Sequence, residues 1–417
     1  MSTDALPTTA TGDSVGAVHS GRGHPGTVSE VFWTFLRLGL TSFGGPVAHL
    51  GYFRDAVVTR RRWLSERSYA DIVALCQFLP GPASSQVGMA LGLQRAGVGG
   101  LLAAWFAFTM PSAILLVAFA FGVTSLGDGV GAGWLLGLKA AAVAVVAQAV
   151  LGMAKTLTPD ARRATIAAAA MVVVLLVPGA LIQVVAIAVG AGAGLLWLRG
   201  IEGAGGDDNA LELRVSRRAG MVSLTAFTVL LVGLPILAGL LADPTVRLVD
   251  VFYRAGSLVF GGGHVVLPLL ETATVPTGLV SHDTFLAGYG AAQAVPGPLF
   301  TFAAFLGASS TVAPTGLVGA GIALLAIFLP AALLVIGVLP FWDRLRHIRS
   351  ARQALLGVNA AVVGILAAAL YDPVFTQGIT SPATLALAVT VFIAQTRWNV
   401  PAWAAVIGAG VVGYFLL

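Results

Sequence analysis

The sequence predicts an all-α polytopic membrane protein built from two homologous halves. The chain has 417 residues, of which 57% are hydrophobic and only 10% are charged, and its mean hydropathy is +0.91. Soluble domains carry about 25% charged residues, so this composition is typical of a chain that lies mostly in a bilayer. Apolar segments follow one another along the sequence, and motifs of the first half recur in the second.

The internal repeat is specific in both sequence and spacing. Residues 36–45 (LRLGLTSFGG) recur as residues 253–262 (YRAGSLVFGG), 217 positions later. The run QFLPGP at 77–82 recurs as QAVPGP at 293–298. Two further matches follow at slightly larger offsets: Pro111 with Pro330, and residues 137–141 with 357–361, so that the offset drifts only from 216 to 220. Two halves that interrupt apolar stretches with Gly and Pro at corresponding places indicate a membrane transporter and mark its binding site.

Composition along the chain divides it into four parts. Residues 1–29 are rich in Gly, Ser and Thr and are predicted to be a disordered tail. We expect a first transmembrane repeat over 30–199 and a second over 248–417. Between them, residues 200–247 are predicted to form a polar loop followed by one linking helix.

Nine apolar segments are long enough, or nearly so, to cross a hydrocarbon core, which needs about 20 helical residues. They are 97–123, 134–154, 163–178, 180–198, 221–242, 315–339, 353–371, 381–396 and 400–417. Four other apolar stretches each contain a Phe-Gly-Gly or Pro-Gly-Pro interruption: 30–53, 70–93, 248–270 and 282–306. A helix cannot run unbroken through Pro-Gly-Pro, and such backbone at membrane depth must be shielded by protein or line a wet cavity.

The placement of arginines favours re-entrant hairpins for the four interrupted stretches. If these stretches turn back, the basic clusters fall on one side of the membrane, as the positive-inside rule expects. The alternative is thirteen full spans. Under either count each half contains the same six apolar segments, and helix 221–242 joins them. The second half should therefore be inverted relative to the first.

Inverted interruptions can meet near the midplane and form an anion site. A helix that starts after a break presents unpaired N–H groups and its positive dipole end, which together bind anions. The glycines expected to line this site are Gly44, Gly45, Gly81, Gly261, Gly262 and Gly297. Other residues expected at the site are Pro80 and the polar residues Gln77, Ser84, Ser85, Gln293 and Thr301. The alternative interpretation is that the breaks are kinks that serve only packing.

Three cations in apolar segments are candidates for neutralising an anion. Arg37 and Arg254 occupy equivalent positions, and an arginine fork suits a tetrahedral oxyanion. Both could instead lie at hairpin mouths and reach lipid headgroups. Lys139 lies within an apolar segment, where it could neutralise a dianion or pair with a carboxylate.

His49 and His264 follow the two Gly-Gly breaks and are candidate ligands or proton carriers, because histidine titrates near neutral pH. Each could equally be a hydrogen-bonded structural histidine.

Several functional classes lack support. The sequence contains neither a Walker A motif nor a close His/Cys cluster, so we expect no ATP motor, metal or other cofactor, and no enzyme activity. Basic residues occur in short runs between apolar segments, which excludes a nucleic-acid partner in favour of the lipid bilayer. Acidic residues within spans are scarce, so the expected substrate is an anion.

At these residues the chain resembles the chromate ion transporter family in its long, two-half form. The stretches that carry the resemblance are 43–49, 74–88, 260–268 and 288–298. The resemblance implies a bacterial inner-membrane protein that exports chromate, driven by an ion gradient, and confers chromate resistance. Sulfate is an alternative substrate, because it is another tetrahedral dianion of similar size. A passive anion channel and a homodimeric assembly stay open, because composition and spacing by themselves reach only an anion transporter.

Overall fold

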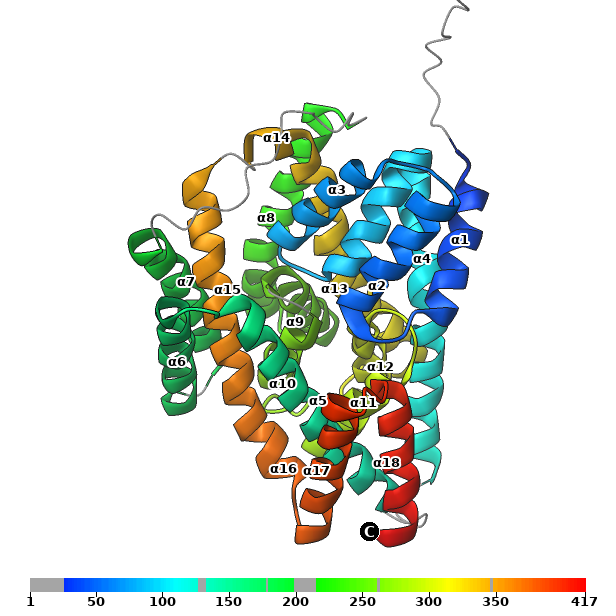
Figure 1. Cartoon of the computed structure of the whole chain (residues 1–417), viewed down its shortest axis with the longest axis vertical. Helices are drawn as coiled ribbons and strands as arrows, with labels where there is room; N and C mark the ends of the chain where they lie inside the picture. Colours follow the sequence, from blue (N-terminus) through cyan, green and yellow to red (C-terminus); the bar gives the residue numbers. More distant parts are fainter. Residues whose placement is uncertain (1–25, 127–132, 178, 199–214, 261–262, 346–347) are drawn as a thin grey trace, which may run out of the picture.

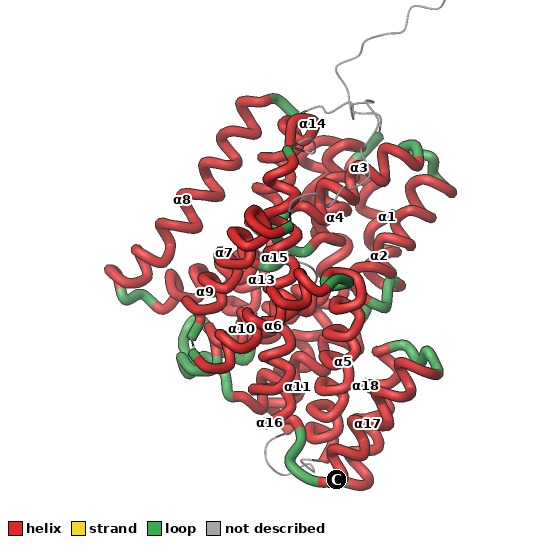
Figure 2. The backbone as a smooth tube through the Cα atoms, turned by 60° about the vertical axis from the view of Figure 1, so that its left-hand side comes forward, coloured by secondary structure: helices red, strands yellow, loops and turns green. Residues whose placement is uncertain are grey.

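The computed structural model describes residues 26–126, 133–177, 179–198, 215–260, 263–345 and 348–417. Within these ranges every regular element is a helix (Figure 1), and Figure 2 shows the loops that connect them. The first half comprises α1 (Val28–Thr41), α2 (Gly45–Arg54), α3 (Glu66–Phe78), α4 (Ala83–Leu126), α5 (Gly133–Leu157), α6 (Ala161–Leu176) and α7 (Ala180–Trp197). After α8 (Arg217–Leu241), the second half comprises α9 (Pro244–Leu258), α10 (Val266–Thr274), α11 (His282–Ala294), α12 (Phe302–Ala308), α13 (Gly316–Val338), α14 (Trp342–Leu345), α15 (Arg349–Ala369), α16 (Thr376–Gly378), α17 (Pro382–Arg397) and α18 (Ala402–Leu416).

The interrupted stretches of the first half are re-entrant hairpins. Glu30, in the first turn of α1, forms an ion pair of 3.0 Å with Arg95 and accepts a hydrogen bond of 2.9 Å from the indole Nε1–H of Trp63. Trp63 lies in the link between α2 and α3, and Arg95 ends the first segment of α4. Both hairpins therefore begin and end on one side of the molecule, which confirms the prediction.

The second half repeats this arrangement. The N–H of Thr311, after α12, donates a hydrogen bond of 2.9 Å to the carbonyl oxygen of Leu279, in the link between α10 and α11. The hairpin of α11 and α12 therefore also returns to the side from which it starts. Thirteen full spans do not describe this chain.

Five helices among the described residues are long and apolar enough to cross a bilayer. They lie within α4, α5, α8, α13 extended to Leu345, and α15 extended to Gly378. In α4 the chain leaves helical geometry at Ala96 and Gly97, so its first segment belongs to a hairpin and its second segment is the span. The four helices α6, α7, α17 and α18 have 15 to 18 residues, about 23–27 Å at 1.5 Å per residue.

The two halves run in opposite directions through the molecule (Figure 1). The long span of α4 descends in that view, whereas its counterpart α13 rises to α14 at the top; likewise α5 rises and α15 descends. The predicted inverted repeat is thus the fold of the described chain.

Each half packs its last two helices on the other half. Helices α17 and α18 pack on α5, and α6 and α7 pack on α15. Equivalent glycines make both contacts close: a Cβ at Gly137 would lie 2.1 Å from the carbonyl oxygen of Ala409, and one at Gly357 would lie 2.0 Å from that of Gly190. Small residues allow such close approach of membrane helices. The repeated glycines therefore allow the last two helices of each half to pack on the opposite half.

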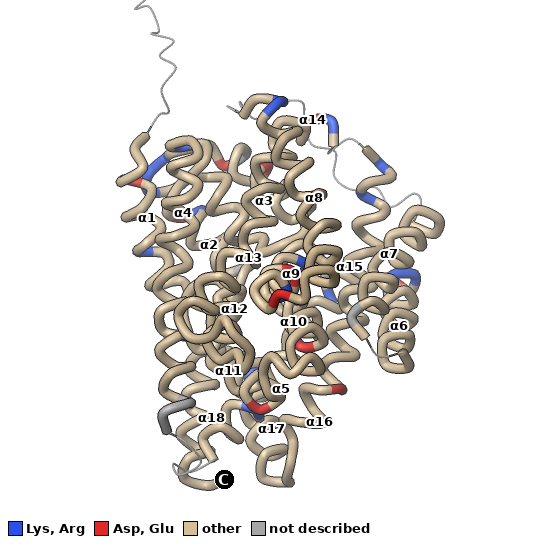
Figure 3. Tube along the Cα trace, turned by 180° about the vertical axis from the view of Figure 1, so that it is seen from behind, with Lys and Arg blue, Asp and Glu red and all other residues tan. Residues whose placement is uncertain are grey.

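Charged side chains are unevenly distributed. Lys and Arg gather toward the end of the molecule that carries α14 and the start of α1 (Figure 3). Positive residues favour the cytoplasmic side, so this end is expected to face the cytoplasm.

Candidate functional site

The backbone breaks of one half meet those of the other. The N–H of Gly297, in the second Pro-Gly-Pro break, donates a hydrogen bond of 2.9 Å to the carbonyl oxygen of Ser42, where α1 ends. The N–H of Gly81, in the first Pro-Gly-Pro break, donates one of 2.7 Å to the carbonyl oxygen of Val259, where α9 ends. Gly81 is the repeat mate of Gly297, and Ser42 is that of Val259. The same contact is therefore made twice, across the boundary between the halves.

The glycines of these breaks are needed for their backbone geometry. The φ angles are +99° at Gly44, +77° at Gly45, +118° at Gly81 and +97° at Gly297. Residues with a Cβ rarely adopt such angles, whereas glycine adopts them at little cost. Gly44 is also the N-cap of α2. Because glycine has no side chain that could accept a capping hydrogen bond, the first N–H groups of α2 have no side-chain acceptor at this position.

One cavity of about 450 Å³ lies where the first Phe-Gly-Gly break faces the second Pro-Gly-Pro break. Its walls come from both halves: the start of α2, the C-terminal half of α5, the turn before α10, the end of α11 with its break, and the end of α17 with the link to α18. Its lining residues are Gly44, Gly45, Pro46, Val145, Gln148, Ala149, Gly152, His264, Ala292, Gln293, Val295, Gly297, Leu299, Gln395, Asn399, Val400, Pro401 and Ala402. None of these described residues is Asp, Glu, Lys or Arg. We call this the central cavity.

Carboxamides supply unpaired hydrogen-bonding groups to the central cavity. The Nε2 atom of Gln293 is buried without a partner, and so are both side-chain polar atoms of Gln395, whose exposed fraction is 3%. An unsatisfied buried polar group costs about 1–3 kcal/mol. The cavity is therefore prepared for a ligand or water that accepts hydrogen bonds.

The two candidate histidines have different surroundings. His264 lines the central cavity, and its Nδ1 lies 2.8 Å from the hydroxyl of Tyr289. His49 is buried; its Nε2 lies 3.2 Å from the carbonyl oxygen of Ser42, and its Nδ1 lies 3.3 Å from the hydroxyl of Ser84. A carbonyl only accepts, so Nε2 carries the proton in the neutral ring and Ser84 donates to Nδ1. His49 thus ties the two breaks of the first half together.

The candidate cations lie outside the lining of the central cavity. Arg37 is exposed on α1. Lys139 pairs with Asp283, with 2.5 Å between Nζ and Oδ1, which is the second of the two alternatives raised for this lysine. Arg254 pairs with Asp250 one turn earlier on α9, also at 2.5 Å.

Other predicted site residues support the breaks. The carbonyl oxygen of Pro80 accepts a hydrogen bond of 2.7 Å from the side-chain amide of Gln86. The hydroxyl of Thr301 donates a hydrogen bond of 2.8 Å to the carbonyl oxygen of Pro298. The Ser85 hydroxyl is buried without a partner, whereas Gln77 is exposed. Gly261 and Gly262 lie outside the described residues.

Sequence reasoning missed three amides of the central cavity: Gln148, Gln395 and Asn399. A signal existed, because Gln148 and Gln395 interrupt otherwise apolar spans. They carry no charge and lie outside the repeated motifs, so neither the charges nor the breaks of the sequence point to them.

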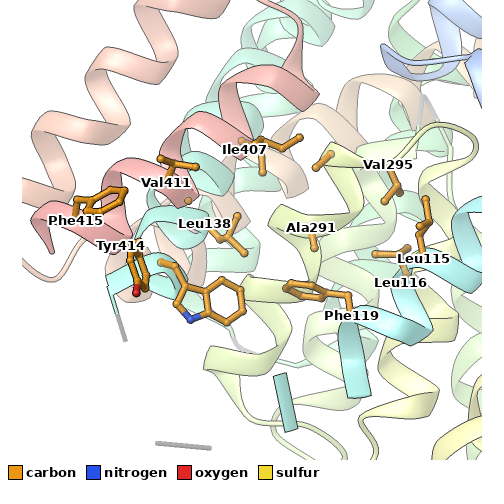
Figure 4. A pocket seen from close by; sticks show the side chains of 14 residues that line it. Leu115, Leu116, Phe119, Leu138, Ala291, Val295, Ile407, Val411, Tyr414 and Phe415 are labelled. Carbon is orange, nitrogen blue, oxygen red and sulfur yellow. The ribbon is translucent and has the colours of Figure 1, made fainter. Parts of the chain in front are cut away.

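The described part of the chain contains two further cavities of about 520 Å³. One is lined by apolar side chains of α4, α5, α11 and α18 (Figure 4), and it shares Val295 with the central cavity. The other lies among α7, α8, α9 and α10 and includes Arg254.

Together, the fold and this cavity define a polytopic membrane protein whose two inverted halves both line a polar cavity, with no Asp, Glu, Lys or Arg among the described lining residues. Such inverted repeats with discontinuous helices are a common architecture of secondary transporters. The chain belongs to the chromate transporter family, whose family model matches residues 29–195 and 246–414, one match for each half.

Curated relatives agree with this assignment. The chain is 29% identical to the chromate transport protein of Pseudomonas aeruginosa, over 84% of this chain and 81% of the relative. It is 25% identical to the chromate transport protein of Cupriavidus metallidurans, over 96% and 95%. A probable chromate transport protein of Synechococcus elongatus is 26% identical, over 83% and 85%. No solved structure matches the chain.

Proposed function

We propose that this protein is a secondary active transporter that exports chromate across the bacterial inner membrane, driven by an ion gradient, and thereby confers chromate resistance. The observation that carries the proposal is the central cavity, where an interruption from each half meets around unpaired amide donors. The names of the relatives supply the substrate, and the cavity supports an oxyanion because its free groups include hydrogen-bond donors.

The binding chemistry follows from a tetrahedral dianion, whose oxygens accept hydrogen bonds from all sides. In the proposed complex, Gln293 and Gln395 donate from their amide nitrogens, and the first N–H groups of α2 donate from the backbone. The positive dipole end of α2 adds attraction for an anion. A full counter-charge is missing from the described lining residues, which favours release, because a transported ion must bind weakly enough to leave.

In this proposal, alternating access depends on which of the two hydrogen bonds between the halves is broken. The Gly297–Ser42 and Gly81–Val259 bonds are repeat mates, so rocking of one half against the other can loosen one while it keeps the other. An inside-negative potential drives a dianion outward by about 2.3 kcal/mol per charge for each 100 mV. Export therefore requires no nucleotide.

Transport by reconstituted protein tests the proposal. The full chain is placed in liposomes, and uptake of radiolabelled chromate is measured against concentration, with sulfate as competitor, with and without an imposed pH gradient or potential. We expect saturable chromate uptake that accelerates with the gradient, and exchange of external for internal chromate. Linear flux without exchange would indicate a passive channel, and uptake of sulfate with no effect of chromate would change the substrate.

Resistance is tested separately in a chromate-sensitive bacterial host. Expression of the chain should raise the chromate concentration that stops growth and lower the chromate content of the cells. Higher chromate content on expression would reverse the proposed direction.

A further inference from the structure

The cavity among α7, α8, α9 and α10 is separate from the central cavity, since the two share no lining residue. Its volume is about 520 Å³, and most of its walls are apolar. Three charged side chains of α9 line it: Arg247, Asp250 and Arg254. We call this the lateral cavity. A charge within a membrane helix is costly and usually marks a functional site.

Only one of the two carboxylate oxygens of Asp250, on the wall of the lateral cavity, has a hydrogen-bond partner. Its exposed fraction is 3%, and its Oδ2 accepts a hydrogen bond of 2.5 Å from an Nη2 of Arg254. Its other oxygen, Oδ1, has no partner, and neither does the buried Nε of Arg254. A buried ion pair that served stability alone would be expected to satisfy its remaining hydrogen-bonding groups. The bare Oδ1 is therefore open to a proton.

The surroundings leave Arg254 as the main partner of Asp250. Helices α7 and α13 contain no ionisable residue. The ionisable residues of α8 are Arg217 and Arg218 in its first turn, whereas the lateral cavity meets α8 near its end, at Ala238. On α10, Glu271 lies 3.8 Å from His282 and is not part of the lining. On α9 itself, Tyr253 donates its hydroxyl to the carbonyl oxygen of Phe227, and exposed Arg247 shares the cavity wall.

Helix α9 connects this pair to the contact between the halves. It ends at Leu258, and the carbonyl oxygen of the C-cap residue Val259 accepts the 2.7 Å hydrogen bond from Gly81. Its Gly256 packs against the backbone of α13, where a Cβ would lie 2.1 Å from the carbonyl oxygen of Ile327. A rearrangement at Asp250 can therefore be transmitted along α9 to the hydrogen bond between Val259 and Gly81.

We propose that Asp250 is the proton-binding carboxylate that couples transport to a proton gradient, with Arg254 as its counter-ion in the unprotonated state. This inference rests on the proposed transport function. A proton entering through the lateral cavity binds Oδ1, the pair separates, and α9 shifts against the other half; release of the proton restores the pair. The adjacent guanidinium disfavours a metal cation at the same carboxylate, so the coupling ion is H⁺.

The experiment compares three forms of the full chain in liposomes with the wild type. They are Asp250→Asn, the charge-balanced double variant Asp250→Asn/Arg254→Gln, and the control Glu66→Gln. Glu66 also pairs with an arginine, Arg54, but the pair is exposed at the surface. Each form is assayed for chromate–chromate exchange at equal pH, for chromate flux under an imposed pH gradient at zero potential, and for luminal pH change reported by a trapped dye.

We expect the wild type and Glu66→Gln to couple chromate flux to the pH gradient and to move protons. Asp250→Asn and the double variant should keep exchange but lose both the gradient stimulation and the pH change. Recovery of coupling in the double variant would overturn the proposal, because it would show that charge balance alone matters. Retained coupling in Asp250→Asn would overturn it as well.

The two proposals fail differently. A wild type that moves no chromate even in the exchange assay contradicts the transport function itself. A wild type that exchanges chromate but ignores the pH gradient contradicts only the role of Asp250.

Discussion

The N–H of Gly297 lies 2.9 Å from the carbonyl oxygen of Ser42, so a residue near position 300 completes the end of a helix that begins at position 28. Its repeat mate, the bond from Gly81 to Val259, closes the other half in the same way. The carbonyl oxygens of Ser42 and Val259, freed where α1 and α9 stop, are thus each satisfied by the opposite half, and irregular backbone at membrane depth must be shielded by protein in this way or line a cavity.

Gly297→Ala should impair transport more than it impairs folding. The φ of +97° is unfavourable for alanine by about 1–2 kcal/mol or more, and the new Cβ would lie 3.0 Å from the hydroxyl of Ser112. Chromate exchange in liposomes and thermal unfolding in detergent measure the two effects. Gly192→Ala is the matched control, because its Cβ meets no atom within 4 Å. Wild-type exchange in Gly297→Ala would show that the break geometry is unimportant.

Gln395→Leu should weaken chromate binding while leaving the fold intact. The substitution removes two buried polar atoms that have no partner in the protein, so folding loses no hydrogen bond. Loss of a donor to a charged ligand costs about 1.5–3 kcal/mol, which appears as a higher half-saturating chromate concentration in the uptake assay.

The control for this prediction is Gln183→Leu, another glutamine with an exposed fraction of only 2%. It lies on α7, and its Nε2 donates to the carbonyl oxygen of Pro268 at 3.4 Å, away from the central cavity. If both variants changed chromate affinity equally, the assignment of Gln395 to the site would be wrong.

Gly137→Leu should destabilise the protein by displacing α18 from α5. Its Cβ would lie 2.1 Å from the carbonyl oxygen of Ala409, and overpacking of a close contact typically costs about 1–3 kcal/mol. A lower unfolding temperature in detergent is the expected result. Gly408→Leu lies on α18, the helix that Gly137 contacts, but its Cβ would meet no atom within 4 Å, so this variant should unfold like the wild type.

Arg37→Ala should leave chromate exchange near the wild-type rate, because the side chain is exposed and lies outside the lining of the central cavity. Uptake kinetics at matched expression check this. Loss of transport with normal expression would mean that Arg37 meets the substrate in a conformation with different exposure.

Acid should loosen the start of α6 through Asp160. Its carboxylate accepts a hydrogen bond of 3.0 Å from the backbone N–H of Arg163, and mainly for this reason its pKa lies below the ordinary value. A lowered pKa stabilises the fold above the unfolded pKa of about 4, and this contribution is lost as pH falls through the folded pKa. Hydrogen exchange of the first turn of α6 should rise only in acid, and Asp160→Asn, which keeps an acceptor, should remove that rise.

The sequence by itself determined the membrane class, the duplicated halves and the positions of the breaks. Composition and motif spacing report these properties directly, because apolar length and the geometry of Gly and Pro act locally. The arginine distribution also favoured re-entrant hairpins, which the contacts of Glu30 with Trp63 and Arg95 confirm.

Only the tertiary structure decided which breaks face each other and what lines the space between them. The first Phe-Gly-Gly motif lies opposite the second Pro-Gly-Pro motif, and the exchanged hairpin of α17 and α18 brings Gln395 to the same cavity. Pairing of Lys139 with Asp283 and of Arg254 with Asp250 likewise depends on how helices pack. A local pattern shows that a charge or break exists, but its partner is chosen by the close approach of helices from distant parts of the chain.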